Sequence, residues 1–136
     1  MLTLADTDLI KSMFDSAMDD LYAVDKSRAN AAKDGREWNT IFKNTYDVLH
    51  ALAEALIQFD KIKAKTHECL FAYLCEKHPG LDFDWKTLDN MRLARNGSVY
   101  YGRPATYGTW KLFELQFKLY IDALKKSVDN KLKNAK

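Results

Sequence analysis

Apolar residues recur every three or four positions over almost the whole chain of 136 residues. This spacing puts apolar side chains on one face of an α-helix, whereas a half-buried strand alternates at every second residue. Only five glycines and two prolines interrupt the pattern. The pattern therefore predicts an all-α fold, an up-and-down helical bundle of four main helices plus an additional helix.

The first helix is predicted from about Asp6 to Lys33. Thr3 and Asp6 have the spacing of a capping box at its start, and Asp34-Gly35 is expected to end it. Its predicted apolar face consists of Leu9, Met13, Phe14, Ala17, Leu21 and Val24.

The next two helices are predicted from about Arg36 and up to His78-Pro79-Gly80, which is a strong stop signal. We expect a break at residues 60–63, because forty continuous helical residues are unusual in a compact domain. The two apolar faces are predicted to contain Ile41, Val48, Leu49, Leu52, Leu56 and Phe59, and then Ala64, His67, Leu70, Phe71 and Leu74.

The fourth helix is predicted from Asp84, a suitable N-cap, to Asn96-Gly97, a pair that often ends helices. A loop over residues 102–109 then leads to a fifth helix from about Thr109. The fourth helix is expected to bury Leu88 and Met91, and the fifth Leu112, Leu115, Leu119, Ala123 and Val128.

The composition is that of one soluble globular domain over residues 1–136, with 47% hydrophobic and 29% charged residues. No apolar run approaches the roughly 18 residues of a membrane span, and the N-terminus has no signal-peptide pattern. We expect a cytoplasmic protein without membrane contact. A net charge of +2 does not by itself indicate a nucleic-acid binder.

Two cysteines and two histidines, Cys69, Cys75, His67 and His78, are the residue types of a zinc site. Their spacing spreads them around a helix, so the sequence predicts no metal site. Phosphate-binding loops of the Walker type, zinc-protease helices and nucleophile elbows are absent from the sequence, and no cofactor is expected.

The stretch RLARNGSVYYGRPATYG, from Arg92 to Gly108, is the best candidate for chemistry. Arg92 and Arg95 share one helical face, and a turn at Gly97 would bring Tyr100 or Tyr101 back beside Arg95. Guanidinium, amide and phenol groups at a helix end suit a phosphate and a stacked base. In the alternative interpretation the arginine caps carbonyls or pairs with an acid, and the tyrosines pack on the fifth helix.

The segments YDVLHALAEALIQFDKIKAKTHECLFAYL and LDNMRLARNGSVYYG resemble the HEPN domain family. The resemblance implies a helical bundle, a homodimer, and a role around RNA or nucleotides in toxin-antitoxin and defence systems, with a nucleotidyltransferase-like protein as partner. Active members are metal-independent endoribonucleases that use an Arg, a polar residue after it, and a His four to six residues beyond. Arg95 and Asn96 match the first two positions, but Tyr100, Tyr101 and Gly102 occupy the places of the His.

The missing His favours binding over cleavage, because an imidazole exchanges protons at neutral pH and a phenol does not. The resemblance then implies an RNA- or nucleotide-binding module with a degenerate ribonuclease motif, in which Arg92, Arg95, Tyr101 and His67 bind. One alternative is a weak endoribonuclease in which Arg95 and Asn96 hold the phosphate while Tyr100, Tyr101 or His67 assists. Another is a helical interaction module without a nucleic-acid role. His67 itself lies on an apolar face, which is typical of a core histidine with its hydrogen bonds satisfied.

Overall fold

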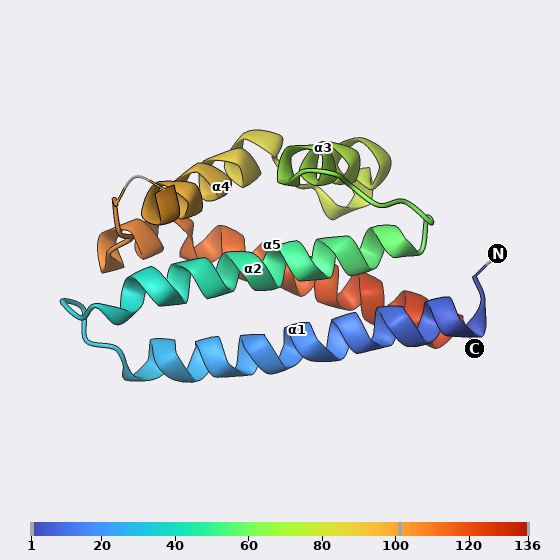
Figure 1. Cartoon of the computed structure of the whole chain (residues 1–136), viewed down its shortest axis with the longest axis horizontal. Coiled ribbons are helices and arrows are strands. Elements are labelled where there is room, and N and C mark those ends of the chain that lie inside the picture. Colours follow the sequence, from blue (N-terminus) through green and yellow to red (C-terminus); the bar gives the residue numbers. More distant parts are fainter. Residues whose placement is uncertain (1, 101, 136) are drawn as a thin grey trace.

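A computed structural model describes residues 2–100 and 102–135, apart from the side chains of residues 5 and 98–100. Every regular element in these residues is helical, which confirms the predicted all-α bundle (Figure 1). The elements are α1 (Leu4–Asn30), α2 (Glu37–Gln58), α3 (His67–Lys77), a short 3-10 helix η1 (Pro79–Leu81), α4 (Trp85–Tyr100) and α5 (Tyr107–Asn134).

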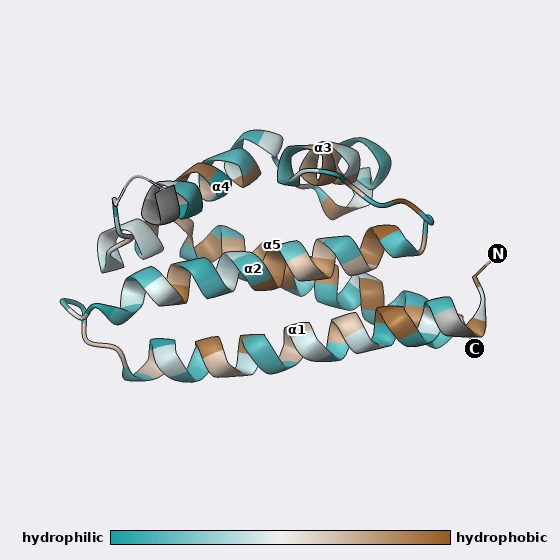
Figure 2. Ribbon diagram, in the orientation of Figure 1, coloured by the Kyte–Doolittle hydropathy of each residue, from teal (hydrophilic) through white to brown (hydrophobic). Residues whose placement is uncertain are grey.

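Helix α2 lies at the centre of the bundle and contacts each of the other four α-helices. More than half of its residues are buried, because it has neighbours on several sides. In Figure 1, α1 runs along one side of α2, α3 and α4 lie on the other, and α5 passes behind it. Figure 2 shows bands of hydrophobic and hydrophilic residues along α1 and α2, as expected of helices that are only partly enclosed.

Several predicted helix ends are confirmed. The Thr3 hydroxyl accepts from the Asp6 amide while the Asp6 carboxylate accepts from the Thr3 amide, which completes the capping box. The Asp84 carboxylate accepts from the Thr87 amide at 3.0 Å before α4. The predicted break between the second and third helices is also present, since α2 ends at Gln58 and α3 begins at His67.

Other predicted ends are wrong by a turn or less. Helix α1 stops at Asn30, before Asp34-Gly35, and α5 begins at Tyr107 because Thr106 caps it. Helix α4 continues through Gly97 to Tyr100. Glycine lowers helix propensity without forcing a stop, and the left-handed glycine is Gly102, with φ of +63°.

The predicted apolar faces of α2, α3 and α4 are confirmed at their central residues, but those of α1 and α5 need correction. On α1, Ile10 is buried and Leu9 is 52% exposed. On α5, Leu112, Leu115 and Leu119 face outward, and the buried face contains Trp110, Phe117, Ile121, Leu124, Val128 and Leu132. Both sets on α5 have helical spacing, and the set with the larger aromatic side chains is the one that packs on α2 (the ring of Phe117 lies 5.2 Å from that of Phe42).

The loop between α4 and α5 is tied to the bundle. The Arg103 amide donates to the Gly97 carbonyl, and the Ala105 amide donates to the Asn39 side chain on α2. The Tyr107 ring packs edge-on against Trp38 with centroids 4.9 Å apart, so the start of α5 is also anchored to α2. Within the described part of the chain, no helix combines the length and apolar character needed to cross a membrane.

Candidate functional site

Four of the residues singled out in the sequence come together in one pocket between α3 and α4. The pocket encloses about 250 Å³ and is lined by Thr66, His67, Glu68, Arg92, Arg95 and Asn96. Thr66 caps α3 by accepting from the Cys69 amide at 3.0 Å, which places the first turn of that helix in the pocket wall. The pocket thus joins a helix N-terminus to two guanidinium groups, an imidazole and an amide.

Tyr100 and Tyr101, the other predicted site residues, cannot be placed in this pocket. The side chain of Tyr100 and the whole of Tyr101 lie outside the described residues. Because α4 is helical through Gly97, the chain makes no turn there that would fold it back onto Arg95. The pocket is formed by α4 and the start of α3 and is supported by residues of α2, and no loop after Arg95 contributes to its lining among the described residues.

Arg95 has hydrogen-bonding capacity that the described residues do not use. Its Nη2 lies 3.5 Å from Oδ1 of Asp47 on α2, an ion-pair distance longer than a good hydrogen bond. Its Nε is buried and has no acceptor among the described residues. A ligand cannot reach this buried Nε, but the Arg95 side chain is 23% exposed, so its outer N–H groups can donate to an anionic ligand with several oxygens.

Arg92 is already engaged with carboxylates. Its Nε and Nη2 donate to Oδ1 of Asp89 at 2.9 and 2.7 Å, and its Nη1 lies 3.6 Å from Oε1 of Glu68. The hydrogen bonds that Arg92 donates to Asp89 raise the pKa of its guanidinium above the ordinary value. Arg92 therefore adds positive charge to the pocket wall, while its donors are largely committed.

His67 forms a hydrogen bond with a buried tyrosine, Tyr46 on α2. Its Nδ1 lies 2.8 Å from the hydroxyl of Tyr46, and Tyr46 is fully buried. Among the described residues His67 is the one partner of this hydroxyl, and a buried phenol hydrogen needs an acceptor, so we assign Tyr46 as the donor and Nδ1 as the acceptor. The neutral ring then has its own hydrogen on Nε2, as a donor.

A second histidine, His50 on α2, packs against His67 with ring centroids 3.9 Å apart and the two rings tilted by 38°. Its Nδ1 lies 2.6 Å from the Glu54 carboxylate, a contact that a neutral ring makes by donating from Nδ1. Burial lowers the pKa of both histidines, and the charge of Arg95 lowers them further. Both rings are therefore neutral at physiological pH.

Sequence reasoning missed Tyr46, Asp47 and His50, which support the pocket from α2. Tyr46, His50 and Glu54 are spaced four apart, so they share one face of α2. This spacing was the available signal, but it does not reveal which other helix the face meets. His67 combines features of the two interpretations given from the sequence. Its Nδ1 has a hydrogen-bond partner in Tyr46, and its ring also lines the pocket.

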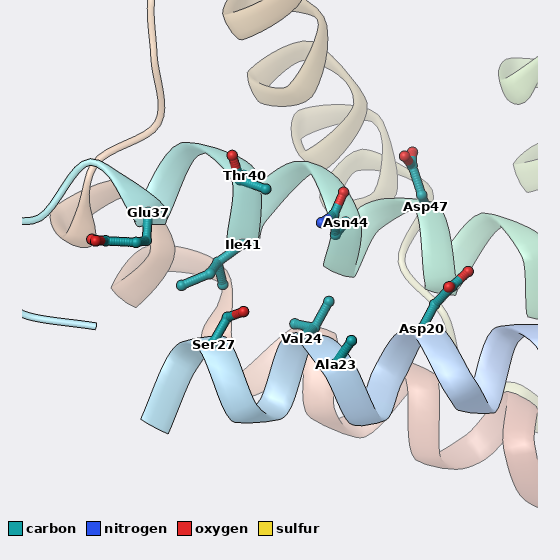
Figure 3. Close-up of a pocket in the computed structure, with 9 residues that line it drawn as sticks. All are labelled: Asp20, Ala23, Val24, Ser27, Glu37, Thr40, Ile41, Asn44 and Asp47. Atoms are coloured by element: carbon teal, nitrogen blue, oxygen red, sulfur yellow. The ribbon is translucent and has the colours of Figure 1, made fainter. Parts of the chain in front are cut away.

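A second hollow, of about 260 Å³, lies between α1 and α2 and has the opposite electrostatic character (Figure 3). Asp20, Glu37 and Asp47 line it together with uncharged residues, and it has no basic side chain. Asp47 thus borders this hollow and also pairs with Arg95 of the α3/α4 pocket. The three carboxylates repel an anion from this hollow, whereas the two arginines of the α3/α4 pocket attract one.

The residue types of the rejected zinc site lie in different environments. The Cys69 side chain is exposed, whereas the Cys75 thiol is partly buried and donates to the Phe83 carbonyl at 3.6 Å. His78 Nε2 lies 2.7 Å from Asp60, far along α3 from His67. Among the described residues, no three His, Cys, Asp or Glu side chains lie close enough to hold a metal ion.

Comparison with known protein families gives no match, and neither curated protein sequences nor solved structures match the chain significantly.

Proposed function

We propose that the pocket between α3 and α4 binds a phosphate group, and that the phosphate belongs to RNA or to a nucleotide. The observation that carries the proposal is the guanidinium of Arg95 in the pocket wall, whose one ion pair among the described residues is the 3.5 Å contact with Asp47. The Arg95 side chain is 23% exposed, so its outer N–H groups can donate to phosphate oxygens, and the planar guanidinium fork suits phosphate geometry.

His67 supports binding more than cleavage. With the Tyr46 hydrogen on Nδ1, the imidazole offers an N–H to the ligand and has no free lone pair for removing a proton from a ribose hydroxyl. A neutral N–H beside Arg95 is a suitable phosphate donor. This arrangement favours a binding module over the alternative of a weak metal-independent endoribonuclease.

The source of the phosphate follows from the HEPN resemblance, which Arg95 and Asn96 carry. On this proposal the protein is a HEPN-like module of a toxin-antitoxin or defence system, with a nucleotidyltransferase-like protein as partner. Three carboxylates, those of Asp47, Glu68 and Asp89, stand close to the two arginines. Their negative charges repel an extended polyanion, so the pocket suits a single phosphate group better than the backbone of a long strand.

The test is equilibrium binding of three probes, inorganic phosphate, a mononucleotide and a short fluorescent RNA. Arg95→Ala should weaken binding roughly tenfold to a hundredfold, because it removes charge-assisted hydrogen bonds worth about 1.5 to 3 kcal/mol. Arg36→Ala is the matched control, since it removes the same charge from an exposed position before α2. Equal losses in the two variants would mean that the pocket is not the binding site.

A digestion assay without metal separates binding from cleavage. The unchanged protein should cut RNA slowly or not at all, and Tyr100→His, which restores the spacing of the family motif, should increase the rate if the geometry allows it, by up to about 10² to 10⁴. Rapid cleavage by the unchanged protein that disappears in Arg95→Ala would favour the endoribonuclease instead.

A further inference from the structure

An imidazole that can accept a proton lies directly behind the α3/α4 pocket. It belongs to His50 on α2, whose ring centroid is 3.9 Å from that of His67 in the pocket wall. Its Nδ1 lies 2.6 Å from the Glu54 carboxylate, so the neutral ring has its hydrogen there, and the Nε2 lone pair has no donor among the described residues. The His50 side chain is 19% exposed, which allows a proton to reach it from solvent.

His67 is less able to take up a second hydrogen. Tyr46 donates to its Nδ1, and its Nε2 already has a hydrogen. A further hydrogen on Nδ1 would leave the buried Tyr46 hydroxyl without an acceptor among the described residues, which is costly. The hydrogen-bond pattern therefore selects His50 as the proton acceptor of the pair.

The charges around the pocket give a reason for an anion to bring a proton with it. Two guanidinium groups are matched by three carboxylates, so they leave no surplus positive charge for a doubly charged ligand. These groups belong to Arg92, Arg95, Asp47, Glu68 and Asp89. A protonated imidazole supplies a further positive charge, and the negative ligand in turn makes protonation more favourable.

We propose that anion binding in the α3/α4 pocket is coupled to the uptake of a proton by His50. The coupling favours a doubly charged phosphate monoester, such as the terminal phosphate of a nucleotide or of a strand, over the singly charged diester within a strand. The inference rests on the proposed function, because it concerns the ligand of the same pocket. It adds the charge of that ligand and the residue that responds to it.

Groups on three helices set the charge of His50 in the free protein. Burial lowers its pKa, the Asp47 carboxylate raises it, and the Arg95 guanidinium on α4 lowers it. The other titratable groups packed against its ring are Glu54 and Tyr46 on α2 and His67 on α3. An anion beside Arg95 offsets the effect of that cation, so the bound state is the one in which His50 becomes charged.

Sulfate and methyl sulfate are the probes that test the coupling, because neither anion titrates between pH 7.5 and 5.5. Any proton taken up is then bound by the protein. Measured by calorimetry at constant ionic strength, the affinity for sulfate should rise roughly tenfold over this range, and that for methyl sulfate roughly threefold, since the attraction to one more cation scales with ligand charge. Two buffers of different ionisation enthalpy should report proton uptake with sulfate.

The outcomes separate this inference from the proposed function. Sulfate binding that takes up no proton and does not change with pH overturns the coupling and leaves the phosphate pocket in place. No binding of either anion at any pH overturns the pocket itself and the coupling with it.

Variants identify the residue that takes up the proton. His50→Gln should remove most of the pH dependence, because an amide does not titrate but can still donate to Glu54. His78→Gln is the matched control, since it removes a histidine that pairs with Asp60 at the far end of α3, and it should keep the pH dependence. Equal slopes in the two variants overturn the assignment to His50.

An NMR titration of the unchanged protein gives the same answer without altering the buried site. Saturating sulfate should raise the pKa of the His50 ring more than that of His67. A larger rise at His67 overturns the assignment of the proton to His50.

Discussion

The guanidinium of Arg95 on α4 reaches Asp47 on α2, with Nη2 and Oδ1 3.5 Å apart. Asp47 is half exposed and also borders the acidic hollow between α1 and α2 (Figure 3). The pair links the central helix to the pocket, and it places a carboxylate where it competes with a bound anion for the same guanidinium.

Asp47→Asn should therefore strengthen phosphate binding about two- to fivefold, the range expected from one partly exposed ion pair. Titration with the mononucleotide measures the change. Asp20→Asn is the control, because it removes an acid from the same acidic hollow on the α1 side. A similar gain in both variants would assign the effect to net charge alone.

Tyr46→Phe should remove the hydrogen bond that fixes the tautomer of His67. In the unchanged protein, long-range proton–nitrogen NMR spectra should show the His67 hydrogen on Nε2, because Tyr46 donates to Nδ1. The variant should lose about 1 kcal/mol in the free energy of unfolding and show a tautomer mixture. A hydrogen on Nδ1 in the unchanged protein would reverse the assigned donor and make His67 a candidate base.

The stability of the fold should decrease on mild acidification. His50 and His67 have pKa values lowered by burial, so between pH 7.5 and 5.5 the unfolded chain, with histidine pKa near 6.5, binds more protons than the native state. The free energy of unfolding, measured with urea, should fall over this range. A double variant, His50→Gln with His67→Gln, should show a smaller slope. An increase of stability toward pH 5.5 would contradict the assignment.

Two neighbouring residues on α1 test which face is buried. Ile10→Ala should cost about 2 to 4 kcal/mol, because Ile10 is buried in the core. Leu9→Ala should change stability by no more than about 0.5 kcal/mol, since its side chain is exposed. Urea unfolding of the two variants compares them directly. Equal costs would indicate that α1 is rotated about its axis.

Two glycines near the end of α4 should respond in opposite directions to alanine. Gly97→Ala should stabilise by up to about 1 kcal/mol, because it is helical and an added Cβ meets nothing within 4 Å. Gly102→Ala should destabilise by about 1 kcal/mol, because its φ of +63° is unfavourable for a side chain. Thermal unfolding of both variants measures the difference, and a stabilising Gly102→Ala would contradict the left-handed turn.

Local chemistry made much of the fold predictable. The Thr3 and Asp84 caps and the stop at Pro79 depend on contacts within a few residues, so the sequence contains the information directly. Local contacts do not determine which face of α5 is buried. Leucines and aromatics each have helical spacing there, and only the packing against α2 selects the aromatic face.

The candidate site was predictable only in part for the same reason. Arg92, Arg95 and Asn96 are close in sequence, and their common location follows from one helix. The approach of His67 and the support from Tyr46 and Asp47 require α3, α4 and α2 to meet. Such contacts depend on tertiary packing, which the spacing of residues along one helix does not specify.

The two thiols differ in a way that gives direct experimental access to the pocket. Cys69 is exposed and lies in the first turn of α3, where its amide donates to Thr66 in the pocket wall. Cys75 is partly buried, and burial raises the pKa of its thiol. A maleimide fluorophore should therefore attach first at Cys69. The native chain then carries an optical reporter in the first turn of α3, two residues after His67, and ligand binding can be followed without introducing a cysteine.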